Sequence, residues 1–155
     1  MKKILILFTC VLLSLNLHAE SFVKPILNGK IQNKLHVNIK AFGQPIKRVK
    51  GGEDECSGVG FFPDTLIYKD FILLDDGKIQ EVVISGSNGL IFHKQRIEKM
   101  SQKMFKQKFK SVLFDIDDTN PNVLFANIET SGNDSIEFIF KSGQLYKYRI
   151  NYDWC

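Results

Sequence analysis

The chain of 155 residues carries 21 lysines and arginines against 17 aspartates and glutamates, so it lacks the strongly basic footprint of a nucleic-acid-binding protein. Its hydrophobic share of 44% and its lack of low-complexity tracts exclude an intrinsically disordered chain. This length suits one domain with a substantial core.

Residues 1–19 have the layout of a secretory signal peptide. Two lysines follow the initial methionine, an apolar run extends from Ile4 to Leu15, and a small residue stands at Ala19. The run is shorter than the about 20 residues that span a bilayer. We therefore expect cleavage after Ala19, a periplasmic or secreted location, and one mature domain over residues 20–155 without a transmembrane segment. The alternative, a buried N-terminal helix, would leave the two lysines and the abrupt polar switch at Glu20 unexplained.

The mature chain would keep two cysteines, Cys56 and Cys155. An even pair in an oxidising compartment predicts a disulfide. This bridge would close a loop of about 100 residues, for which chain entropy allows about 4 to 5 kcal/mol. Two free thiols, or intermolecular pairing through Cys155, are the alternatives.

The first predicted helix covers residues 31–42. Its apolar residues recur at helical spacing, and Gly43 and Pro45 supply signals that end a helix. The apolar positions are Ile31, Leu35, Ile39 and Phe42.

A β-hairpin follows the polar loop after this helix. The runs Thr65–Leu74 and Ile79–Ile84 are apolar enough for strands, and Asp75–Gly77 between them is a turn signal. Ser85–Gly89 predicts a second turn.

The second predicted helix covers residues 94–110 and has one apolar stripe in an otherwise basic surface. We interpret the basic face as the solvated side of a core-facing helix; the alternative is attraction of an acidic partner, anionic lipid headgroups or wall polymers. The stripe contains Ile97, Met100, Met104, Phe105 and Phe109, and the basic face contains Lys94, Arg96, Lys99, Lys103, Lys106, Lys108 and Lys110.

Four further runs predict strands, and the last two form a hairpin around Gly143. Apolar residues alternate along both, so we expect their shared face to belong to the sheet core rather than to a binding surface. This requires Phe140 to pair with Tyr146 across a three-residue loop. The runs are Val112–Ile116, Val123–Ile128, Ser135–Lys141 and Leu145–Trp154.

These elements predict an α+β fold, an antiparallel sheet with amphipathic helices packed on one face. A shift of 66 positions superimposes the two halves, with Ile31 on Ile97 and Gly77 on Gly143. Two divergent helix-plus-meander repeats, over 27–86 and 93–155, would explain this order. Chance alignment of two ordinary segments is the alternative.

The segment Val112–Thr119 resembles the first motif of haloacid dehalogenase-type phosphatases. The resemblance would make Asp115 a nucleophile and Asp117 an acid/base, with magnesium held between them. However, only 36 residues follow Thr119, and they predict antiparallel strands instead of the parallel α/β domain that this chemistry needs. We interpret the motif as a strand followed by an acidic turn.

The same turn has an alternative as a calcium site. Asp115, Asp117, Asp118 and Asn120 offer oxygen ligands at nearby positions. The glycine and the closing glutamate of an EF-hand loop are missing, so this question stays open at the level of the sequence.

Histidine and cysteine chemistry gives no further site. His36 and His93 lack the paired spacing of a zinc site, and no serine or cysteine motif accompanies them. We expect no enzyme, no catalytic residue, no metal and no cofactor.

The candidate partner-binding residues lie in the polar loop before and after Cys56. Acidic and aromatic side chains on a disulfide-anchored loop would suit protein recognition, as aromatic anchors with a charged rim. The alternative is a structural loop whose phenylalanines enter the core. The residues are Glu53, Asp54, Glu55, Phe61 and Phe62.

The layout resembles the tandem-repeat fold of secreted β-lactamase inhibitor proteins and of small outer-membrane assembly lipoproteins. The resemblance is carried by Ile31–Pro45 and by Tyr68–Ile84 with its Gly77 hairpin. It implies helical pairs on a curved sheet and a protein-binding role.

We therefore expect an exported protein-binding protein, an inhibitor or immunity-type protein that neutralises an exported toxin or a wall-degrading enzyme. The alternative is an accessory factor for envelope assembly or structure. The expected partner is a protein, and nucleic acid is not expected.

Overall fold

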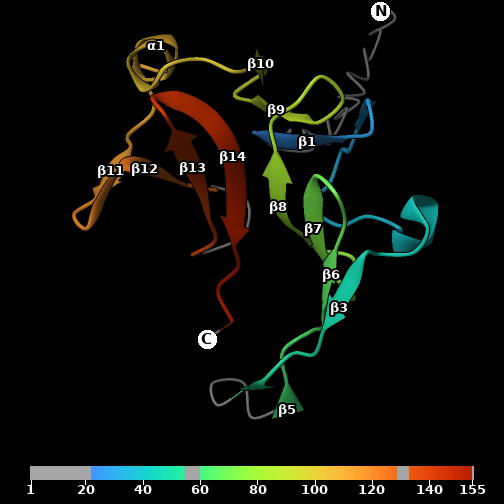
Figure 1. Cartoon of the computed structure of the whole chain (residues 1–155). Helices are drawn as coiled ribbons and strands as arrows, with labels where there is room; N and C mark the ends of the chain where they lie inside the picture. The colour runs from blue at the N-terminus through green and yellow to red at the C-terminus, as the bar shows by residue number, and fades with distance from the viewer. Residues whose placement is uncertain (1–21, 55–59, 129–132, 155) are drawn as a thin grey trace, which may run out of the picture.

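The computed structural model describes residues 22–54, 60–128 and 133–154, which form two antiparallel sheets and a small separate hairpin (Figure 1). The strands are β1 (Val23–Leu27), β2 (Lys30–Ile31), β3 (Lys47–Val49), β4 (Glu53–Asp54), β5 (Gly60–Phe61), β6 (Thr65–Ile67), β7 (Phe71–Leu74), β8 (Ile79–Val83), β9 (Gly89–Phe92), β10 (Gln95–Ile97), β11 (Asp115–Asp117), β12 (Asn120–Asn127), β13 (Ser135–Lys141) and β14 (Gln144–Asn151). The larger sheet has the order β11-β12-β13-β14-β8-β7-β6-β3, the smaller β10-β9-β1-β2, and β4 pairs with β5.

The predicted α+β fold with amphipathic helices on the sheet is wrong. The described residues contain one α-helix, α1 (Gln102–Lys108), and one 3-10 turn, η1 (Ile39–Phe42). The protein is mostly β, and the two segments predicted as long helices keep only short helical parts, η1 in the first and α1 in the second. No helix in these ranges is long and apolar enough to cross a membrane.

The helix predicted over residues 31–42 is replaced by chain that lies against the β7–β8 hairpin. The Ile79 amide donates to the Leu35 carbonyl at 2.8 Å, and the Val37 amide donates to the Gly77 carbonyl at 2.8 Å. These tertiary hydrogen bonds satisfy backbone groups that a helix would have used. Only η1 remains helical, and it ends at Gly43 with a φ of 71°.

The first part of the helix predicted over residues 94–110 belongs to a β-hairpin in the structure. The helical spacing of the apolar residues does not indicate this hairpin. His93 and Lys94 both have positive φ, which is the conformation of a two-residue turn, and they join β9 to β10. The helix begins only after Ser101, whose hydroxyl accepts a hydrogen bond from the Met104 amide. The prediction of one continuous basic helix face is therefore wrong, since Lys94 lies in the turn and Arg96 on β10.

The helix-plus-meander repeats predicted over 27–86 and 93–155 fail for the same reason. The described residues of the first unit contain no α-helix, and the second starts at the turn of the β9–β10 hairpin and reaches α1 only after β10. The element order of the two units therefore differs.

The β7–β8 hairpin is confirmed, with Phe71 opposite Val82 and Gly77 at a φ of 96°. The run predicted as one strand from Thr65 to Leu74 is divided, because β6 and β7 themselves pair in an antiparallel hairpin.

The last hairpin is confirmed, but its turn differs from the prediction. Phe138 pairs with Tyr148, which the expected register requires, yet the register then shifts and Phe140 pairs with Leu145. The turn has two residues of positive φ at its centre, so the register shift leaves Tyr146 on the exposed side. Ile136, Phe138, Phe140, Tyr148 and Ile150 of the shared face are buried in the core, as predicted, whereas Tyr152 and Trp154 at its end are half-buried.

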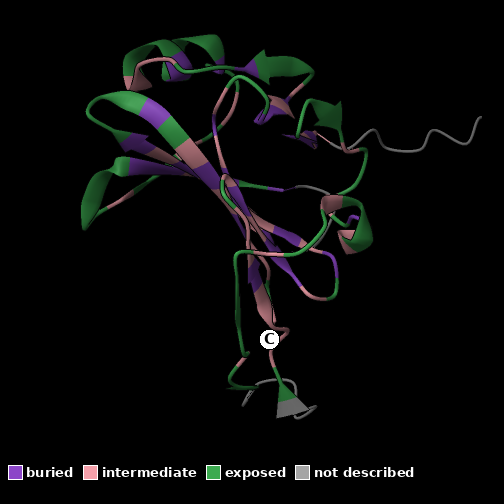
Figure 2. Ribbon diagram, turned by 45° about the vertical axis from the view of Figure 1, so that its right-hand side comes forward, coloured by how far each residue is buried: buried purple, intermediate pink, exposed green. Residues whose placement is uncertain are grey.

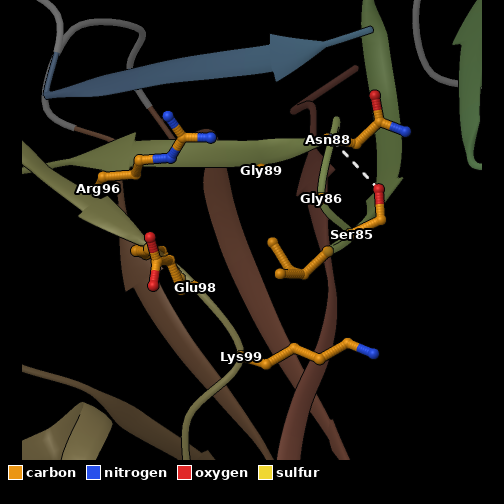
Figure 3. A pocket seen from close by; sticks show the side chains of 9 residues that line it. Ser85, Gly86, Asn88, Gly89, Arg96, Glu98 and Lys99 are labelled. Carbon is orange, nitrogen blue, oxygen red and sulfur yellow. Dashed lines mark hydrogen bonds between the residues drawn. The ribbon is translucent and has the colours of Figure 1, made fainter. Parts of the chain in front are cut away.

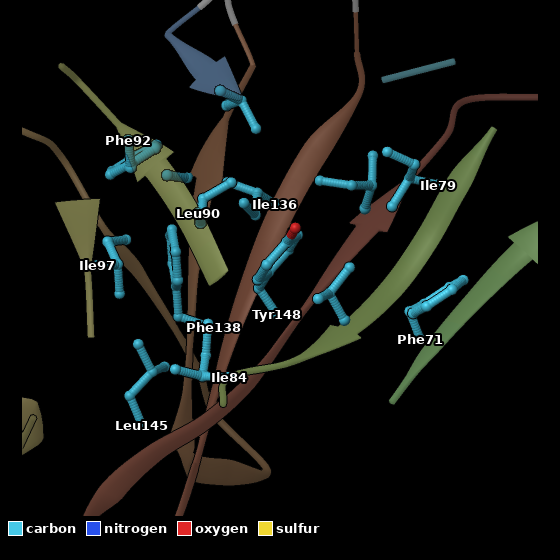
Figure 4. Close-up of a cluster of buried hydrophobic side chains, with 14 of the residues drawn as sticks. Phe71, Ile79, Ile84, Leu90, Phe92, Ile97, Ile136, Phe138, Leu145 and Tyr148 are labelled. Atoms are coloured by element: carbon cyan, nitrogen blue, oxygen red, sulfur yellow. The ribbon is translucent and has the colours of Figure 1, made fainter. Parts of the chain in front are cut away.

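The core lies between the two sheets and beneath α1 (Figures 2 and 4). The buried Tyr148 hydroxyl of β14 donates to the Gly89 carbonyl of β9 at 3.1 Å and so joins the sheets. Burial raises the pKa of Tyr148, which keeps this donor protonated. A cluster of aromatic rings packs the α1 region onto the larger sheet; its members are Phe92, Phe105, Phe109, Phe114, Phe138 and Phe140.

Candidate functional site

The β4–β5 hairpin extends beyond the end of the larger sheet, apart from the core (Figures 1 and 2). Glu53 pairs with Phe61 across it, and the Phe62 amide donates to the Gly52 carbonyl at 2.9 Å. We name residues 51–63 the projecting hairpin; of these, residues 55–59 lie outside the described ranges.

Charged side chains fix the stem of the projecting hairpin to the main sheet. The guanidinium of Arg48 on β3 donates to Asp64 at 2.6 Å and to Asp75 at 2.8 Å. The Asp64 carboxylate also accepts from the Gly51 amide at 3.1 Å, and the Asp64 amide donates to Asp75 at 3.1 Å. One cation thus ties both ends of the stem to the β7–β8 turn.

The same contacts set the charge states in the stem. The hydrogen bond from Arg48, followed by that from the Gly51 amide, lowers the pKa of Asp64. The hydrogen bond to Asp64 in turn raises the pKa of Arg48. Both groups therefore stay ionised at neutral pH, as the clamp requires.

A glycine allows the two sides of the stem to approach closely. A Cβ atom on Gly51 would lie 1.8 Å from the Phe62 carbonyl oxygen. A backbone atom cannot rotate away from such a clash, so the stem geometry depends on glycine at this position.

Phe61 and Phe62 have different environments because adjacent strand residues point to opposite sides. The Phe61 side chain is 72% exposed. The Phe62 ring packs edge-on against Trp154, with ring centroids 5.9 Å apart. Phe61 is therefore free for a partner, whereas Phe62 helps to hold the hairpin against the C-terminal segment.

Trp154 belongs to a small aromatic cluster under the hairpin. The Lys78 ammonium lies 3.9 Å from the centroid of the Trp154 ring, and the Tyr152 ring lies 6.0 Å from it. The Tyr152 hydroxyl donates to the Ile79 carbonyl at 2.8 Å, and burial raises the pKa of this hydroxyl. The cluster fixes the chain immediately before Cys155.

The predicted partner-binding residues thus have different outcomes. Glu53 and Phe61 lie opposite each other and exposed on the hairpin, Asp54 lies in β4 beside them, and Phe62 is a packing residue. Glu55 lies outside the described residues.

The two cysteines of the predicted disulfide, Cys56 and Cys155, also lie outside the described residues. The contact between Phe62 and Trp154 does bring together the chain segments that lead to them. The bridge itself stays a prediction.

The acidic turn does not assemble a metal site in the described parts of the chain, where no group of three or more histidine, cysteine, aspartate or glutamate side chains lies close enough. Asp117 instead accepts hydrogen bonds from the Thr119 hydroxyl at 2.6 Å and amide at 2.8 Å, which lower its pKa. β11 pairs antiparallel with β12, in line with the acidic-turn interpretation.

Neither histidine lies on a helix. His36 forms an isolated bridge with Lys78, and the His93 ring contacts Phe22 and Phe92 with centroids 4.8 and 4.6 Å apart. The His93 ring therefore sits among aromatic packing contacts, whereas His36 is exposed.

A cleft of about 430 Å³ lies between the β8–β9 turn and β10 (Figure 3). Arg96, Glu98 and Lys99 contribute its charged side chains. The Ser85 hydroxyl accepts from the Asn88 amide, and no histidine lies among the lining residues that the structure describes. A Ser–His pair of the kind that activates a serine nucleophile is therefore not among these lining residues.

Comparison of the chain with models of protein families, with curated proteins and with solved structures finds no match.

Proposed function

We propose that the protein is an exported protein-binding protein, an inhibitor or immunity-type protein that neutralises an exported toxin or a wall-degrading enzyme. The projecting hairpin is its contact surface. The observation that carries this proposal is Phe61, 72% exposed on a hairpin whose stem is fixed by the Arg48 clamp.

Exposure of one phenylalanine is common on protein surfaces. The fixed stem is what distinguishes Phe61 from an ordinary exposed residue. Buried aromatic anchors contribute much of the binding energy in protein interfaces, and a fixed anchor loses less conformational entropy on binding. Glu53 opposite Phe61 supplies a charged rim. An aromatic anchor with an acidic rim fits a partner with an apolar pocket bordered by basic residues.

A capture experiment from periplasmic extract tests the proposal. The mature protein, Phe61→Asp and Tyr146→Asp are each immobilised; Tyr146 is a matched control because it is an aromatic residue, 38% exposed, on β14. We expect one soluble protein to be retained by the wild type and by Tyr146→Asp, and to be lost with Phe61→Asp. With the purified partner, the affinity should fall about 30-fold or more, as at an interface hot spot of about 2 kcal/mol.

The activity of the captured partner separates the candidate functions. Loss of toxin or wall-degrading activity on stoichiometric addition of the protein supports inhibition. A membrane-bound complex as the partner would favour the envelope accessory factor instead. Equal retention by all three forms would contradict the role of the projecting hairpin.

Export is tested separately, because residues 1–19 lie outside the described ranges. We expect the protein from the periplasm to begin at Glu20 and to contain no titratable thiol until it is reduced. An uncleaved chain in the cytoplasm with free thiols would contradict the periplasmic proposal.

A further inference from the structure

β3 (Lys47–Val49) is an edge strand of the larger sheet. β6 pairs with one side of it, and no strand within the described ranges pairs with the other. An open edge presents backbone groups to which an extended chain can add as a further strand. Figure 1 shows β3 at this edge, with η1 beside it.

A groove of about 580 Å³ with both apolar and basic lining adjoins this edge, between η1 and β6. Ile39, Leu66 and Tyr68 contribute apolar surface to it, and the Ile46 side chain on its rim is 74% exposed. The Tyr68 ring stacks on Phe71 with centroids 4.7 Å apart, so this wall is fixed by the core. The groove is thus a preformed recess beside the strand edge.

The charges around the groove favour an anionic occupant. Lys40 and Lys47 line it, and neither forms an ion pair with any residue that the structure describes. The nearby carboxylates of Asp64 and Asp75 both pair with Arg48, which cancels one of their two negative charges, and neither carboxylate lines the groove. Carboxylates of an added strand would find two free cations at the rim.

The same charges disfavour a second copy of this chain. Pairing of β3 with β3 would bring Lys47 and Arg48 close to their own copies, and like charges in adjacent strands are destabilising. Lysine on an edge strand is a common means of preventing such self-association. Pairing of β3 with a second copy is therefore disfavoured, and pairing with an acidic strand is favoured.

We propose that an extended acidic segment of a partner protein binds by adding to β3 as a further strand. An apolar side chain of the segment occupies the groove beside Ile46, and its carboxylates face Lys40 and Lys47. This site is separate from Phe61, although Arg48, which lines the groove, also holds the stem of the projecting hairpin.

Selection from a display library of extended peptides of about eight residues tests the proposal. The peptides alternate apolar positions with acidic, basic or neutral polar positions. We expect enrichment of the acidic set. A synthetic acidic peptide with the selected sequence then serves as the probe in fluorescence anisotropy.

Variants locate the probe on the surface. Ile46→Asp and Lys47→Glu should each weaken binding about tenfold, since each places a negative charge where a carboxylate would bind. Ile31→Asp is the matched control, because Ile31 is an isoleucine on β2, 53% exposed, and should leave the affinity unchanged. Phe61→Asp should also leave it unchanged, so failure of the hairpin proposal is distinguishable from failure of this one.

N-methylation of alternate peptide amides separates strand addition from simple charge attraction. One of the two alternate methylation patterns should abolish binding, because it removes the hydrogen bonds to β3. Equal binding of both patterns would overturn strand addition. Enrichment of basic or neutral peptides, or no effect of Ile46→Asp, would overturn the site, and a dimer lost on Ile46→Asp would show that a second copy covers the edge.

Discussion

Phe138 in the core and Phe61 on the projecting hairpin are both phenylalanines in short-range antiparallel pairs, yet their surroundings are opposite. Phe138 is fully buried, with the rings of Phe92 and Phe105 centred 5.0 and 4.6 Å away. Phe61 is 72% exposed. The comparison shows that the same residue type is packed in the core in one region and lies on the surface in the other.

The two regions are also held by different forces. Apolar burial fixes the core, whereas ion pairs and one close glycine contact fix the stem of the hairpin. Local stability differs across a protein where contacts differ in this way. The stem should therefore respond to single substitutions and to pH separately from the core.

Truncation of the two phenylalanines gives the largest expected contrast. Phe138→Ala should lower the free energy of unfolding by about 3 to 5 kcal/mol, because it leaves a cavity among packed rings. Phe61→Ala should change it by less than about 0.5 kcal/mol, as at ordinary surface positions. Urea unfolding monitored by circular dichroism measures both.

Equal losses of unfolding free energy in the two variants would contradict the difference between core and hairpin, since they would mean that Phe61 is buried in solution. Phe71→Ala is a second core control on β7, where the side chain is 6% exposed.

The β7–β8 and β13–β14 hairpins could be predicted from local sequence, unlike the two long helices. Gly77 and Gly143 mark turns with positive φ, and a turn depends on few residues. The helix at residues 31–42 is predicted from four apolar residues, but its backbone pairs with Gly77 and Ile79. Such long-range hydrogen bonds leave no local signal, and they override a weak helical period.

Gly51→Ala is the next largest expected change. The added methyl group would overlap the Phe62 carbonyl, so the stem must shift, at a cost of about 1 to 3 kcal/mol. We expect partner binding through Phe61 to weaken even though Phe61 itself is unchanged.

The control for this variant is Gly52→Ala, because a Cβ atom on Gly52 meets nothing within 4 Å. Hydrogen exchange of the hairpin amides should increase in Gly51→Ala alone. Unchanged exchange in both variants would show that the stem does not need the close contact.

Tyr148→Phe probes the bond between the sheets. Loss of the hydroxyl leaves the buried Gly89 carbonyl without this donor, which costs about 1 to 2 kcal/mol. Burial raises the folded-state pKa of Tyr148 above its usual value. Its contribution is therefore complete below the unfolded-state pKa of about 10 and is lost as the pH rises further.

Alkaline denaturation tests the predicted direction of this pH dependence of stability. Stability of the wild type should fall with pH above about 10, and in Tyr148→Phe the slope should be smaller by about one proton. Tyr146→Phe, at an exposed position, should keep the wild-type slope. The same slope in all three proteins would contradict burial of the Tyr148 hydroxyl.

The candidate site was predicted in part. Composition drew attention to Glu53, Asp54 and Phe61, because acidic and aromatic residues cluster before and after one cysteine. Nothing in the sequence indicated that Arg48 would reach Asp64 and Asp75, since pairs 16 and 27 residues apart have no periodic signature. The fixed stem was therefore visible only in three dimensions.

The smallest expected effect concerns Asp64 at acid pH. Its pKa is lowered in the folded state, chiefly by Arg48, so its contribution is present above the unfolded-state pKa of about 4 and is lost as the pH falls below it. The effect is small because the Arg48 side chain is 58% exposed and solvent screens the pair.

The fluorescence of Trp154 reports protonation of Asp64 locally, since Trp154 is the one tryptophan of the chain and packs against Phe62 at the stem. In the wild type its fluorescence should shift below about pH 4, before the circular dichroism signal of the sheets is lost. Asp64→Asn should show the shifted emission already at neutral pH and little further change on acidification.

The control variant is Asp115→Asn, because Asp115 is an exposed aspartate on the opposite edge of the sheet. It should behave as the wild type. A wild-type acid transition that persists in Asp64→Asn would mean that the stem is held by contacts other than the Arg48 clamp, and the distinction between an ion-paired hairpin and an apolar core would no longer hold.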